Sequence, residues 1–177
     1  MSKLVFEHSP PTSLDRNDFL FVYGGVYEKT PWIAEVVFDE GLSPECDTLD
    51  GLVSALARRV EQSCETRQLA LLRAHPDLAG KLAAAGELTA DSTLEQAGAG
   101  LDQCTPDELA AFQDLNARYT EKFGFPFIIA VSGLQREQIL EIFKTRLNNS
   151  KQDEFETALA EVHKIARIRL MALATAK

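Results

Sequence analysis

The sequence predicts an all-α protein, a single compact domain of about eight helices that spans residues 1–177. Two observations lead to this prediction. Apolar residues recur at a helical spacing through most of the chain, and residues typical of helix ends separate one stretch from the next. A chain of 177 residues with 45% hydrophobic side chains is long and apolar enough to bury one core.

The first half of the chain is expected to hold an irregular arm and three helices. Residues 1–13 form the arm, because two adjacent prolines oppose a helix there. A first helix is expected over 14–23, where two glycines end it. Thr30 would cap a second helix over 31–40, and a stripe of apolar residues predicts one long helix over 48–74.

The second half is expected to contain five more helices. His75-Pro76-Asp77 would open a short helix that Gly86 closes, and Ser92 would begin the next one. Thr105-Pro106-Asp107-Glu108 has the pattern of a capping box, in which threonine and glutamate bind each other's backbone amides. The remaining predicted helices cover, in order, 105–123, 134–147 and 153–173.

One segment departs from the helical pattern. Residues 125–131, with the sequence FPFIIAV, are apolar, aromatic and β-branched, as in a strand. No second segment offers a pairing partner, so its backbone amides and carbonyls must find other partners. A bound ligand is one such partner.

Composition excludes several classes of function. The net charge of −9 argues against nucleic acid and against an anionic membrane surface. No apolar run reaches the roughly 20 residues that a membrane-spanning helix needs. The three cysteines are far apart and the histidines have no metal-ligand spacing, so we expect reduced thiols, a cytoplasmic location and no metal. No nucleotide-binding motif is present.

His75 is the first candidate for chemistry. Because it precedes Pro76, it is held out of the helical region and would lie at the mouth of a helix. The amides and the positive end of the dipole there suit an anion, and an imidazole exchanges protons near neutral pH. A capping or surface histidine is the alternative.

Ser92-Thr93-Leu94-Glu95-Gln96 is the second candidate. Its S-x-x-E pattern fits a capping box, and it also fits a helix mouth whose serine, glutamate and glutamine face a ligand. The two interpretations are compatible. The last helix carries a third candidate, Arg169, on the same seam as Phe155 and Val162. It would be paired, or bind an anion, if buried, and would otherwise extend to solvent; Arg146 and Arg167 compete with it.

At these residues the chain resembles a known family, the 2-oxo-4-hydroxy-4-carboxy-5-ureidoimidazoline (OHCU) decarboxylases of urate breakdown. The resemblance runs in order along nearly the whole chain, and its departures lie mostly in the N-terminal third. The combination of three motifs makes it specific. They are HPDLAG at 75–80, STLEQ at 92–96 and FGFPF at 123–127, with further matches at 30–35, 115–119 and 165–170.

The resemblance implies an all-helical, homodimeric enzyme without metal or organic cofactor. It would decarboxylate the small ureidoimidazoline to (S)-allantoin, with His75 as proton donor and Glu95 as a second catalytic residue. The implied substrate contacts are Pro76, Ser92, Thr93, Leu94, Glu95, Gln96, Phe127, Ile128, Ile129, Ala130, Val131 and Arg169.

Three rival interpretations remain open. The chain could be a non-catalytic module that binds a ureide or purine metabolite, or a structural domain that dimerises through an apolar helix face. A different decarboxylation or lyase reaction on a related heterocycle is the nearest enzymatic rival.

Overall fold

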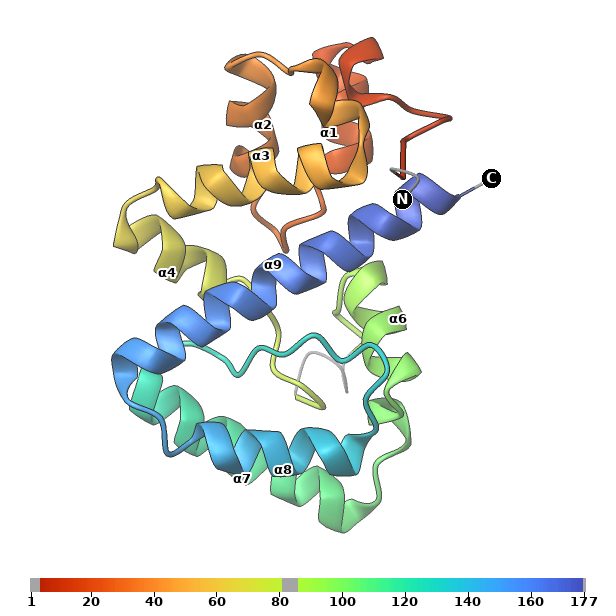
Figure 1. Cartoon of the computed structure of the whole chain (residues 1–177). Coiled ribbons are helices and arrows are strands. Elements are labelled where there is room, and N and C mark those ends of the chain that lie inside the picture. The colour runs from red at the N-terminus through yellow and green to blue at the C-terminus, as the bar shows by residue number, and fades with distance from the viewer. Residues whose placement is uncertain (1–3, 81–85, 177) are drawn as a thin grey trace. The chain divides into compact units, whose positions relative to one another are not determined.

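The structure is a computed structural model that describes residues 4–80 and 86–176. Within these ranges it contains eight α-helices, and its only β pairing is an isolated bridge between Val5 and Thr48. The predicted all-α class is therefore confirmed (Figure 1). The chain divides into two compact units. The first comprises Met1–Ala74 with His163–Lys177, and the second is His75–Val162.

The first unit is built from short helices. In chain order its elements are the 3₁₀-helix η1 (Pro11–Ser13), α1 (Arg16–Tyr23), α2 (Trp32–Asp39), the 3₁₀-helix η2 (Pro44–Asp47), α3 (Leu49–Glu61) and α4 (Glu65–Arg73). The last helix, α9, spans Lys151–Thr175, and the part of it from His163 onward belongs to this unit. Consecutive helices of this unit pack on each other. The core contains Phe6, Phe19, Tyr23, Ile33, Leu52, Leu56 and Val60, all almost fully buried.

Two predicted helix boundaries in this unit are wrong. Thr30 does not cap α2, because its hydroxyl donates a hydrogen bond to the carbonyl of Glu28 instead. The long helix expected over 48–74 is two helices, α3 and α4, separated at 62–64. The side chains of Ser63 and Gln68 both donate to the carbonyl of Val60, an acceptor that a continuing helix would have used.

Gly51 lets the first turn of α3 lie directly against η2. A Cβ at this position would stand 1.9 Å from the carbonyl oxygen of Glu45, which is backbone and cannot rotate away. We therefore expect Gly51→Ala to lower the free energy of unfolding by about 1–3 kcal/mol, measured by urea denaturation. Gly98→Ala is the matched control, because nothing lies within 4 Å of that Cβ. Equal stability of the two variants would contradict this account.

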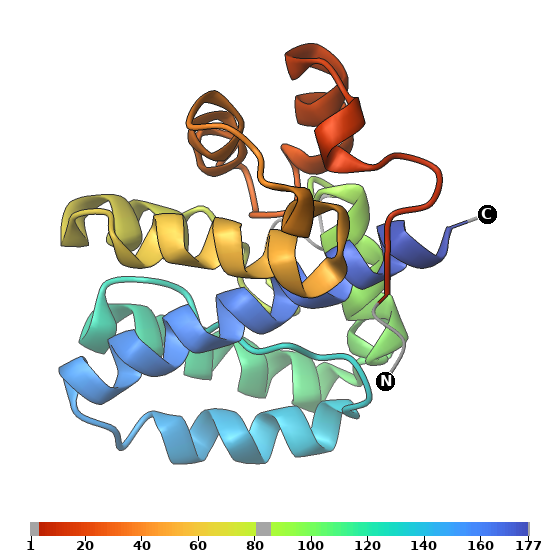
Figure 2. The same ribbon diagram turned by 45° about the horizontal axis from the view of Figure 1, so that its top comes forward.

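The second unit is built around two helices that run in the same direction and the extended segment that connects them. Its elements are α6 (Ala90–Gly98), the 3₁₀-helix η3 (Leu101–Gln103), α7 (Pro106–Phe123), α8 (Arg136–Arg146) and the earlier part of α9. The Thr105–Glu108 capping box is confirmed, and Gly124 ends α7 with a φ of 80°. Helices α7 and α8 lie side by side in Figures 1 and 2.

Residues 125–131 contain no regular secondary structure and pair with no strand. The aromatic rings of this segment pack on the helices of the same unit. Phe127 stacks on Phe143 of α8 with 3.8 Å between ring centroids, and Tyr119 of α7 meets Phe127 edge to face. An extended segment is therefore fixed among helices, as its apolar sequence predicted (Figure 2).

No helix in the described part of the chain is long and apolar enough to cross a membrane. The three cysteines are free thiols, of which Cys46 is buried and Cys64 is exposed.

Candidate active site

His75 follows directly after α4, whose last turn is capped at Ala74. Its side chain is buried, with 9% of its surface exposed, and Pro76 beside it is half-buried. Residues 75–80 form a bend and a turn and not the first turn of a helix, so the predicted helix start at His75 is wrong. The rest of that predicted helix, 81–85, lies outside the described residues.

The turn after His75 is tightly folded. Ala79 has a φ of 48°, in the left-handed region, which costs a residue with a Cβ on the order of 1–2 kcal/mol. At the next position only glycine fits, because a Cβ on Gly80 would lie 2.6 Å from the Cβ of Asp77. A turn with this strain must be held in place by contacts with its surroundings.

The N-cap of helix α6 lies three residues before the predicted cap, Ser92. Thr89 is its N-cap and accepts a hydrogen bond from the amide of Ser92, so Ser92 lies within the first turn and does not cap the helix. Ser92 and Gln96, one turn apart, are both buried, and Glu95 is half-buried. Thr93 is exposed, and Leu94 is 73% exposed.

A direct hydrogen bond joins the two candidate groups. The amide of Ala79 donates to Oε1 of Gln96 at 3.1 Å, so the turn that carries His75 lies against the buried face of α6. Next to this contact is a cleft of about 330 Å³, lined by Ala79, Gly80, Leu88, Thr93, Gln96, Ala97, Leu101, Asp102, Cys104 and Leu109.

Two charged side chains hold the predicted backbone-binding segment. Nη1 of Arg146 donates to the carbonyl of Ile128 at 2.7 Å, and the amide of Ala130 donates to Oε2 of Glu161 at 2.8 Å. Phe127, Ile128, Ile129 and Val131 are buried, and Ala130 is half-buried. The protein itself therefore supplies partners for two of the backbone groups for which the sequence suggested a ligand.

Arg146 belongs to a buried network of charges. Its guanidinium pairs with Glu154 of α9. The Glu154 side chain is fully buried and also accepts hydrogen bonds from the Tyr119 hydroxyl and from Nδ2 of Asn149. Burial and the carboxylate of Glu154 raise the pKa of Tyr119 far above its usual range, so its hydroxyl stays protonated and donates. The guanidinium also lies 4.5 Å from the ring centroid of Phe127.

Arg169 is buried and paired, which is one of the two outcomes expected for it. It belongs to the first unit, where its Nη1 lies 2.9 Å from Oε2 of Glu28 and also faces the carbonyl of Val26. Arg167 pairs with Asp50 at an exposed position, in agreement with its solvated interpretation. Both arginines that are buried in the described ranges thus have a carboxylate partner.

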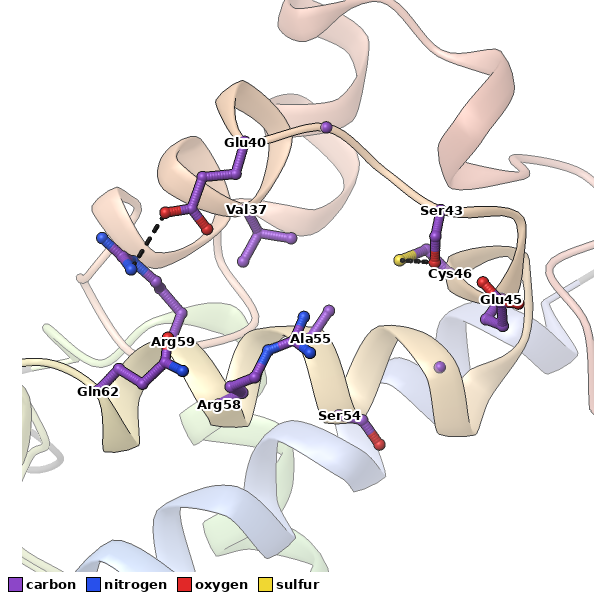
Figure 3. A pocket seen from close by; sticks show the side chains of 12 residues that line it. Val37, Glu40, Ser43, Glu45, Cys46, Ser54, Ala55, Arg58, Arg59 and Gln62 are labelled. Carbon is purple, nitrogen blue, oxygen red and sulfur yellow. Dashed lines mark hydrogen bonds and ion pairs between the residues drawn. The ribbon is translucent and has the colours of Figure 1, made fainter.

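A different hollow, of about 410 Å³, lies between α2 and α3 in the first unit (Figure 3). Arg59 pairs with Glu40 at its rim at 3.1 Å, and Ser43 lies 3.9 Å from the thiol of Cys46. None of the residues predicted for the site lines it. Among the described residues no cluster of three or more histidine, cysteine, aspartate or glutamate side chains could hold a metal ion.

Sequence reasoning missed one residue at the candidate site. Asn116 of α7 is buried and donates from Nδ2 to the carbonyl of Leu78 at 2.9 Å, within the turn after His75. A signal was present, since Asn116 shares the buried face of α7 with Phe112, Leu115 and Tyr119. A polar residue on an apolar helix face needs a hydrogen-bond partner.

The structure is an all-α protein in which a histidine-bearing turn lies against one helix, next to a cleft of about 330 Å³. The family model for OHCU decarboxylase matches residues 12–171. The chain belongs to the OHCU decarboxylase family, and its resemblance to these carboxy-lyases is thereby confirmed.

Individual relatives agree with this assignment. The OHCU decarboxylase of Halalkalicoccus jeotgali is 42% identical and that of Mus musculus 37%, over 88% and 89% of this chain and 85% and 87% of theirs. The crystal structure of (S)-allantoin synthase matches with a TM-score of 0.72 and 29% identity, over 92% of this chain and 52% of that one. The crystal structure of OHCU decarboxylase in the presence of (S)-allantoin shares the fold, with a TM-score of 0.66 and 21% identity, over 92% and 100%.

Proposed function

We propose that this chain decarboxylates OHCU to (S)-allantoin during urate degradation. Family membership supports the reaction class. The assignment of particular residues is supported by the hydrogen bond from the amide of Ala79 to the side chain of Gln96. This hydrogen bond ties the turn bearing His75 to the helix bearing Ser92 and Glu95, as one shared site requires.

The reaction requires that the substrate is oriented, that the electron pair of the broken bond is delocalised, and that one proton is delivered to the carbanionic carbon. As the bond to the carboxylate carbon breaks, carbon dioxide leaves and the electron pair spreads into the conjugated carbonyl and imine of the substrate ring. His75 then donates a proton to one face of the carbanionic carbon, which gives a single enantiomer. The substrate ring acts as the electron sink in this scheme.

The other residues bind and orient the substrate. Ser92 and Gln96 offer hydrogen bonds from the buried face of α6, and Pro76 lines the site beside His75. Glu95 orients the histidine or holds the hydroxyl and ureido groups of the substrate. Thr93, Leu94 and the segment 127–131 complete the contacts, the segment through backbone groups other than those bound by Arg146 and Glu161.

Three further properties form part of the proposal. The whole chain acts as one domain, which the unbroken family match over 12–171 supports. It works in the cytoplasm, where the exposed thiol of Cys64 stays reduced. It forms a homodimer. In addition, Arg169, which forms an ion pair with Glu28 of the same chain, acts as an accessory contact for an anionic group of the substrate.

Optical activity tests the reaction directly. Urate is oxidised and its first product hydrolysed in the presence of the protein, while the optical rotation of the solution is followed. We expect optically active (S)-allantoin at a rate above that of spontaneous decay. A racemic product at the uncatalysed rate would favour a non-catalytic binding module and overturn the proposal.

A further inference from the structure

A single peptide bond in the turn after His75 is held from two helices. The carbonyl of Leu78 accepts from Nδ2 of Asn116 on α7, and the amide of Ala79 donates to Oε1 of Gln96 on α6. These two groups belong to the same peptide unit. Because that peptide is trans, its C=O and N–H point in opposite directions, and the two carboxamides bind opposite edges of it.

We infer that Asn116 is a positioning residue that, together with Gln96, fixes the turn 75–80 and so the direction of the His75 imidazole. This inference rests on the proposed role of His75 as proton donor. These two hydrogen bonds hold the peptide that leads into Ala79, whose φ of 48° is unfavourable for a residue with a side chain. Without both hydrogen bonds the turn would relax toward commoner backbone angles.

The hydrogen bonding of Asn116 argues that its role is orientation. Its Oδ1 is buried and meets no donor in the part of the chain that the structure describes. A buried acceptor without a partner is unfavourable, so an asparagine here is a poor choice for stability alone. Leucine would fill the same position on the apolar face of α7. The hydrogen bond that Nδ2 donates to Leu78 is therefore what distinguishes asparagine from leucine at this position.

Two substitutions remove this donor while keeping the size of the side chain. Asn116→Leu replaces the carboxamide with an apolar group, and Asn116→Asp replaces the donor with an acceptor. We expect kcat to fall on the order of a hundred-fold in both, because a displaced proton donor loses its alignment. KM should change little, since a residue that acts only through the turn alters the alignment of the proton donor more than substrate binding. Gln113→Leu, an exposed carboxamide one turn earlier on α7, is the control and should keep kcat.

Hydrogen–deuterium exchange provides a readout that does not depend on catalysis. In both Asn116 variants the backbone amides of 75–80 should exchange faster than in the wild type. In Asn116→Leu the protection of α7 and the melting temperature should change little, because this variant also removes the unpartnered Oδ1, whereas the buried carboxylate of Asn116→Asp should lower the melting temperature as well. If Asn116 were merely structural, Asn116→Leu would instead lower the melting temperature and speed exchange throughout the second unit. Unchanged exchange at 75–80, or unchanged kcat with faster exchange, would each overturn the inference.

The two proposals fail in distinguishable ways. If the wild-type protein yields racemic allantoin, the proposed function fails, and exchange at 75–80 still decides whether Asn116 holds the turn. If the wild type is active and stereospecific but both Asn116 variants match it, only the positioning role fails.

Discussion

Replacing His75 with alanine is expected to lower kcat by about a hundred- to ten-thousand-fold, the usual contribution of a positioned proton donor. The allantoin that still forms should approach a racemate, because the proton then comes from water on either face. The measurement is the optical rotation and rate of allantoin formation from freshly generated substrate. His75→Gln should show the same loss, since glutamine keeps hydrogen bonding but does not transfer a proton at neutral pH.

Two checks separate chemistry from folding in this experiment. His75 is buried, so the helical content and melting temperature of both variants must match those of the wild type. His8→Ala is the matched control, because His8 is exposed in the N-terminal arm, and it should keep full activity. Near-normal turnover and handedness in folded His75→Ala would show that another group delivers the proton.

Helix ends were predictable where the signal lies within a few residues. The Thr105 capping box and Gly124 are local features, and both ends of α7 agree with the sequence. The start of α6 was not predictable in this way. Thr89 and Ser92 each precede a plausible first turn, and only the tertiary fold, which buries Ser92 and Gln96 on one face, selects Thr89. The same holds for the break between α3 and α4, which depends on the side chain of Gln68.

The residues of the candidate site were predictable by type, but their partners were not. Arg169 was recognised as an unusual residue on the seam of the last helix, yet its partner Glu28 is 141 positions away. The charges of Arg146 and Glu161 satisfy backbone groups of the segment 128–130, which the sequence could only assign to a ligand. Pairings of this kind follow from packing, and no local pattern encodes them.

Glu154→Leu is expected to lower the free energy of unfolding by about 3–5 kcal/mol, because it leaves the guanidinium of Arg146 buried without its counter-charge. Glu154 is 0% exposed, and Arg146 donates to it from both Nε and Nη2. Tyr119 and Asn149 would lose their acceptor as well. Urea denaturation measures the change, and Glu156→Leu, at an exposed position on the same helix, should leave the stability almost unaltered.

The double variant Arg146→Met/Glu154→Leu distinguishes the charge penalty from the function of the pair. Replacing both buried charges with apolar groups should recover part of the lost stability, because no uncompensated ion remains, while Tyr119, Asn149 and the carbonyl of Ile128 stay without these partners. Activity should not recover with it, since the carbonyl of Ile128 loses the hydrogen bond from Arg146 that fixes the segment 127–131, which we propose to contact the substrate. A stable double variant with full activity would show that this segment needs no such support. A Glu154→Leu protein as stable as the wild type would show that the carboxylate does not neutralise Arg146.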